Sequence, residues 1–98
     1  MPNTALASAP ALPELSHRES DDNYRSVVAV LNTRWRVIEC RDRLQWILQH
    51  AKKKRDGVVW ESRSYLRTRE GLISFSTWHA GEISPDAMAV LTSLPERI

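Results

Sequence analysis

Residues 44–66 read LQWILQHAKKKRDGVVWESRSYL, and this stretch specifies most of the predicted fold. Its first seven residues place Leu44, Trp46 and Leu48 on one face, and this period of two is typical of a β-strand. The polar run AKKKRDG at 51–57 predicts a hairpin loop, because Gly57 supplies the positive φ that a tight turn needs.

Further strand patterns lie on both sides of this segment. VVWESRSYL at 58–66 alternates Val58, Trp60 and Leu66 with more polar positions, which predicts the partner strand of the hairpin. Upstream, SVVAVLNTRWRVIEC at 26–40 is rich in β-branched residues and is also strand-like. Within it, Asn32-Thr33 is either a tight turn or a bulge inside one long strand. Sequential strands with short links form an antiparallel meander, here of three or four strands.

Two short helices are predicted after the strands. Thr68 is a good N-cap for the first helix, and Gly81 suits the position just after its end. Ser84 caps a second helix with Pro85 at its first position, and Pro95 ends that helix. The predicted fold class is therefore α+β, an antiparallel meander followed by two short helices packed on one sheet face.

The expected core lies between the sheet and the helices. Its predicted members are Trp46, Leu48, Trp60, Leu72, Ile73, Val90 and Leu91. Trp35 and Val37 are expected to point inward, which leaves Arg34 and Arg36 on the outer sheet face. Trp78 is the candidate for an exposed aromatic side chain.

Residues 1–23 differ in composition from the rest of the chain. They begin with an Ala-, Pro- and Ser-rich run and continue into the polar patch HRESDDN at 17–23. We expect this segment to be a disordered tail, because it has too little periodic apolar surface to offset the entropy of ordering. Residues 24–98 are then the single small α+β domain.

Length and composition exclude several classes of protein. A chain of 98 residues, 42% of them hydrophobic, holds one modest core and excludes the large enzyme architectures. No apolar run approaches the roughly 18 residues that a membrane span needs. The first residues lack the pattern of a secretory signal, and a single cysteine suits a reducing compartment. We therefore expect a cytoplasmic protein without a membrane partner.

Catalytic motifs are missing from the sequence. It has no Gly-rich phosphate loop, no nucleophile elbow and no pattern of paired acids. His17, His50, His79 and Cys40 share no metal-ligand spacing. The prediction is a protein that is not an enzyme and that needs no cofactor and no metal.

The charge is strongly segregated along the chain. Residues 24–69 carry a net charge of +8, whereas residues 1–23 and 70–98 each carry −3. A basic middle segment can attract phosphates or an acidic protein surface, although acidic ends that fold back would neutralise it. The candidate binding residues are Arg34, Arg36, Arg41, Arg43, Lys52, Lys53, Lys54, Arg55, Arg63, Tyr65 and Arg67.

Two surfaces are candidates within that set. The run from Lys52 to Arg55 is either a phosphate-contacting loop or a solvated hairpin tip. An outer sheet face with Arg34, Arg36, Arg63 and Tyr65 suits nucleic acid, because aromatic rings stack on bases while Arg binds phosphate.

The segments RWRVIEC, LQWILQ and W-x-S-R-S-Y, together with TREGL, resemble small uncharacterised proteins of bacterial genomes and prophages. The resemblance covers about residues 27–95 and implies a binder of host or phage machinery. The leading hypothesis is a non-enzymatic module whose basic face and hairpin loop bind a polyanion, namely nucleic acid. The alternative is a phage-type accessory protein that binds and inhibits an acidic or nucleic-acid-handling bacterial protein complex, for example a CRISPR defence system. Homodimerisation through an exposed sheet edge is a third hypothesis.

Overall fold

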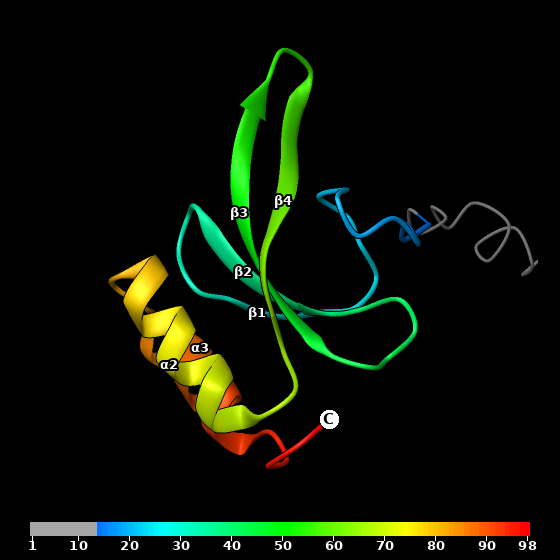
Figure 1. Ribbon diagram of the computed structural model, residues 1–98. Coiled ribbons are helices and arrows are strands. Elements are labelled where there is room, and N and C mark those ends of the chain that lie inside the picture. The colour runs from blue at the N-terminus through cyan, green and yellow to red at the C-terminus, as the bar shows by residue number, and fades with distance from the viewer. Residues whose placement is uncertain (1–13) are drawn as a thin grey trace, which may run out of the picture.

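The computed structural model describes residues 14–98 and shows one four-stranded antiparallel sheet followed by two helices (Figure 1). The strands lie in the order β1-β2-β3-β4, so each strand pairs with its neighbour in sequence. The predicted α+β meander is confirmed. The elements are β1 (Val27–Val30), β2 (Trp35–Glu39), β3 (Trp46–Lys54), β4 (Gly57–Leu66), α2 (Arg69–Ala80) and α3 (Pro85–Ser93).

The two links between strands differ in how well the sequence predicts them. Residues 31–34 form a turn between β1 and β2, so the turn at Asn32-Thr33 is the correct alternative. The predicted loop at 51–57 is wrong in its extent, because Lys52, Lys53 and Lys54 continue β3 and pair with β4 down to Gly57. Only residues 55 and 56 form the turn, and Gly57 has the expected positive φ of 135°.

Both helices cover one face of the sheet (Figure 1). Thr68 and Ser84 cap them as predicted, since their hydroxyl groups accept hydrogen bonds from the backbone N–H groups of Gly71 and Ala87. The core on this face joins strand residues to helix residues. Its fully or nearly fully buried members are Ala29, Leu31, Val37, Trp46, Leu48, Leu72, Ala87 and Leu91. Val90, a predicted member, is 38% exposed instead.

A β-bulge moves Trp60 to the opposite face. Leu48 pairs with Ser64, but the next residue, Gln49, pairs with Ser62, so Arg63 is the extra residue. An extra residue reverses which side chains face the helices, because side chains alternate along a strand. Trp60 therefore lies on the face opposite Leu66, and its predicted packing against the helices is wrong.

The segment from Glu14 to Ser26 lies on the face that the helices leave open (Figure 1). Ser16 forms a bridge with Tyr24, and Asp21 forms a bridge with Val59 at the edge of β4. Tyr24 packs with Ile38, Cys40 and Ile47 in a second, smaller core. Two predictions, a disordered tail to residue 23 and a domain start at 24, therefore differ from the structure over residues 14–23. Residues 1–13 lie outside the described residues.

Polar contacts explain why this segment is ordered without apolar periodicity. The backbone N–H of Trp60 donates to the Ser20 carbonyl at 2.9 Å, and the Trp60 indole N–H donates to the Asp22 carboxylate at 2.9 Å. The Tyr24 hydroxyl donates to the Glu39 carbonyl at 2.9 Å, and burial raises the pKa of Tyr24, with the nearby Glu19 charge adding to the effect. Neither helix, in the part of the chain that the structure describes, has the length and apolar character to span a bilayer.

Candidate functional site

Arg36 does not belong to an exposed binding face, and that prediction is wrong. The residue is 2% exposed and lies under the N-terminal segment. Its guanidinium also stands 4.4 Å from the centre of the Trp60 ring, a cation–π contact. It donates hydrogen bonds of 2.8 to 3.0 Å to three backbone carbonyl groups and one side-chain oxygen, those of Glu19, Asp21, Asp22 and Gln49.

This environment lowers the pKa of Arg36 but leaves its guanidinium protonated at neutral pH. Burial lowers the pKa of Arg36 to about 10, against the opposing effect of the Asp22 and Asp21 carboxylates. The guanidinium is therefore protonated at pH 7, and its charge is used to hold the N-terminal segment on the sheet. Arg36 is a structural residue.

The remaining candidates are separated along the sheet. Arg41 and Arg43 lie in the turn between β2 and β3, and Arg67 follows β4, so all three are near the Trp46–Leu66 pair. The run Lys52–Arg55 lies at the other end of β3. The two ends are roughly 26 Å apart, at about 3.3 Å per strand residue. The two groups of cations are therefore too far apart to form a single compact binding surface.

The hairpin from Lys52 to Val59 projects beyond the rest of the sheet, and we call it the basic arm (Figure 1). The pairing of β2 with β3 ends at Trp35 and His50, so β2 does not flank the basic arm, and Asp21 bridges the arm at its last residue, Val59. Lys52 Nζ lies 3.5 Å from one carboxylate oxygen of Glu61. The other carboxylate oxygen of Glu61 lies 3.3 Å from a guanidinium nitrogen of Arg63. Within residues 14–98, the side chains of Lys53, Lys54 and Arg55 form no ion pair and are exposed.

Arg34 lies in the β1–β2 turn, next to the base of the basic arm. Its carbonyl accepts a hydrogen bond of 2.8 Å from the backbone N–H of Ala51, which ties the β1–β2 turn to the base of the basic arm. A hollow of about 500 Å³ lies between the turn and the arm. Its lining residues are Thr33, Arg34, His50, Ala51, Lys52, Lys53 and Val58. Arg34 and the basic arm therefore form one positively charged region.

Four rings form a continuous row beside this region, and we call them the aromatic row. Phe75 and His79, one helical turn apart on α2, have ring centroids 6.0 Å apart and planes 10° apart. The His79 centroid lies 5.9 Å from that of Trp35, which lies 4.5 Å from that of His50. Phe75 and His79 are exposed, whereas Trp35 and His50 are half-buried.

Asn32 holds the two halves of the aromatic row together. Its side-chain amide donates to the carbonyls of Ala80 and Glu82 at 3.1 and 2.9 Å, at the C-terminal end of α2. Its side-chain oxygen accepts from the backbone N–H groups of Arg34 and Trp35 at 2.8 and 3.0 Å. The turn, α2 and Trp35 are thus fixed by one side chain.

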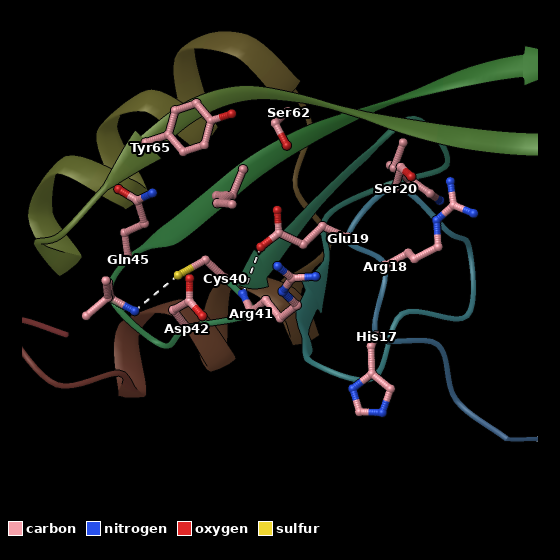
Figure 2. Close-up of a pocket in the computed structure, with 13 residues that line it drawn as sticks. His17, Arg18, Glu19, Ser20, Cys40, Arg41, Asp42, Gln45, Ser62 and Tyr65 are labelled. Carbon is pink, nitrogen blue, oxygen red and sulfur yellow. Dashed lines mark hydrogen bonds between the residues drawn. The ribbon is translucent and has the colours of Figure 1, made fainter.

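The opposite face carries a second hollow, of about 560 Å³, between the N-terminal segment and the sheet (Figure 2). The Glu19 carboxylate accepts a 2.7 Å hydrogen bond from the backbone N–H of Arg41, and Cys40 Sγ accepts one of 3.1 Å from Leu44. Figure 2 shows acidic and basic groups mixed along its wall. Of the predicted binding residues only Arg41 and Tyr65 line it, and its balanced charge does not favour a polyanion.

The cations of the basic arm are predicted from the sequence, but the aromatic row is not. Strand alternation places Trp35 in the core and does not predict its contact with His50. The pairing register of β2 with β3 brings these two residues together. Only the spacing of four residues between Phe75 and His79 could have been recognised from the sequence. Within residues 14–98, no group of three His, Cys, Asp or Glu side chains could hold a metal ion.

No family model, curated protein or solved structure matches this chain. The function is therefore inferred from the geometry of the described residues.

Proposed function

We propose that this protein is a non-enzymatic module that binds nucleic acid through the basic arm and Arg34. The observation that carries the proposal is the exposure of Lys53, Lys54 and Arg55 on a two-stranded projection, with no ion pair in residues 14–98. Cations that lack carboxylate partners are available to neutralise phosphates, and such contacts supply most of the affinity of non-specific binding.

The arrangement of the charges supports a phosphate backbone as the ligand. Side chains alternate along β3, so Lys53 projects from one face of the arm while Lys52 and Lys54 project from the other. Arg55 lies at the turn, where its planar guanidinium can bind a phosphate in a bidentate manner. Charges on both faces and at the tip can follow a polyanion that wraps around the arm.

The phage-type accessory role remains the alternative prediction, because an acidic protein surface would also complement the arm. Self-association through a sheet edge likewise stays a prediction. A cytoplasmic location is part of the proposal, since a lone cysteine suits a reducing compartment.

The proposal predicts a change in the salt dependence of binding. Replacing Lys53, Lys54 and Arg55 with Ser should lower the slope of log affinity against log salt by roughly two to three units, about 0.7 to 0.9 per lost phosphate contact. Stability should change little, because exposed charges contribute little to folding. Binding of an oligonucleotide, measured by fluorescence anisotropy over a range of salt concentrations, gives the slope.

A charge-matched control distinguishes local contacts from net charge. The variant with Arg41→Ser, Arg43→Asn and Arg67→Ser removes three positive charges at the other end of the sheet; Asn tolerates the positive φ of 59° at position 43. Its slope should stay close to that of the unaltered chain. Equal slopes for both variants, or no binding at low salt, would contradict the proposal, and a partner retained from nuclease-treated lysate would then favour the accessory role.

A further inference from the structure

We infer that the aromatic row is a platform on which bases of single-stranded nucleic acid stack. The inference rests on the proposed function, because the basic arm supplies the phosphate contacts that bring a strand to this surface. It adds a ligand class: a strand with unpaired bases, as opposed to a duplex.

The exposed pair of rings on α2 is the part of the row on which a base could stack. Phe75 is 46% exposed, His79 is also exposed, and their ring planes lie within 10° of each other on α2, so a base could stack on this pair. The half-buried Trp35 and His50 continue the row onto the sheet, with centroid spacings of 5.9 and 4.5 Å and ring planes tilted by 36° and 47° to their neighbours. Rows of a few rings stack roughly two or three bases in sheet-type RNA-binding modules.

The row and the basic arm form one continuous surface. His50 pairs with Trp35 and lies two residues before Lys52, so His50 and Lys52 project from the same sheet face. The hollow at the base of the arm is lined by His50, Arg34 and Lys52 together. A strand whose bases lie on the rings would therefore place its backbone beside these cations.

This combination favours a single strand for a physical reason. In a duplex both faces of each base are covered by neighbouring bases, so side-chain rings cannot stack on them unless the duplex is opened. Single-strand binders combine a positively charged track with aromatic rings, and this surface has both. The hydrogen bonds of Asn32 hold α2 and Trp35 in place before any ligand arrives, which reduces the entropy lost on binding.

The test compares three single strands of equal length and charge, each of about a dozen nucleotides: an oligothymidylate, an oligouridylate that compares RNA with DNA, and an abasic phosphodiester strand. A duplex of the same length is the fourth ligand. The chain should bind the base-containing strands about tenfold more tightly or better. The variant with Phe75→Ser and His79→Ser should lose this preference and bind the abasic strand unchanged. Both side chains are exposed, so circular dichroism should show an intact fold.

Tyr65→Ser is the matched control, because Tyr65 is 58% exposed but lies on the other sheet face, paired with Ile47. It should retain the preference. Equal binding of base-containing and abasic strands by the unaltered chain would overturn the inference alone, as would tighter binding of duplex or a loss of preference in Tyr65→Ser only. A chain that binds none of these strands at low salt would overturn the proposed function as well.

Discussion

Replacing Arg36 with Ala should lower the free energy of unfolding by about 3 to 5 kcal/mol, because buried acceptors that lose their donor cost about 1 to 3 kcal/mol each and the relief of charge burial offsets part of the total. The substitution leaves the carbonyls of Glu19, Asp21 and Asp22 and the side-chain oxygen of Gln49 without their donor. Such a loss is a large share of the roughly 5–15 kcal/mol that stabilises a typical domain. Urea unfolding at neutral pH measures it, and the melting temperature should fall by more than about 10 °C.

Two opposing effects decide the size of this loss. Burial penalises the charge, as the lowered pKa of Arg36 shows, and removing the side chain relieves that cost. Four hydrogen bonds to a charged group act in the other direction, each with a net value of about 1.5 to 3 kcal/mol. The hydrogen bonds outweigh the burial cost of the charge, so the variant is destabilised.

The sign of the pH dependence follows from the same shift. The pKa of Arg36 is lowered to about 10 in the folded chain, so both states are protonated at this group below about pH 9. Its contribution to stability should therefore be constant from pH 6 to 8. Only above pH 10 would the unfolded state bind more protons at this group, and the contribution of its ionisation to stability would then rise with pH.

Arg34→Ala is the matched control, because it removes the same charge two residues away from an exposed position. It should change the unfolding free energy by no more than about 0.5 kcal/mol. Arg36→Lys keeps the charge but loses the planar fork, so it should recover only part of the stability. A value for Arg36→Ala near that of Arg34→Ala would contradict the structural role assigned to Arg36.

Arg34 and Arg36 illustrate which features of a strand can be predicted from the sequence: the face on which a side chain lies, but not whether that face is covered. Alternation correctly places Arg36 on the face opposite Trp35 and Val37, and cap residues correctly locate both helices. Alternation cannot show whether a second layer covers a sheet face. Here the covering segment is polar and binds through its backbone carbonyls, which have no pattern in a sequence.

The error at Trp60 has a different physical origin. The strand from Gly57 to Leu66 contains one extra residue at Arg63, and a single insertion reverses the faces on either side of it. Nothing in the side chains near the bulge marks its position. The aromatic row escapes prediction for a similar reason, since Trp35 and His50 meet only through the pairing register.

A chain that begins at Asn23 should be less stable than one that begins at Glu14 by about 3 kcal/mol or more. The shorter chain loses the backbone acceptors of Arg36 and the cover over Trp60, which is 8% exposed, and Gln49, which is 1% exposed. Comparing these two chains by urea unfolding isolates residues 14–22.

Combining the truncation with Arg36→Ala turns this comparison into a double-mutant cycle. If Arg36 stabilises the fold by holding residues 19–22, the two losses overlap, and the double variant should be more stable than their sum predicts by about 2 kcal/mol. Additive losses would show that Arg36 and the segment act independently. The N-terminal segment reaches the basic arm at the Asp21–Val59 bridge, whereas the arm's cations Lys53, Lys54 and Arg55 lie beyond that bridge, toward the tip. The truncated chain should therefore also keep the salt slope of binding, as long as it stays folded. If the truncated chain folds but no longer binds, the ligand site would instead be the hollow beside Glu19, on the opposite face of the sheet.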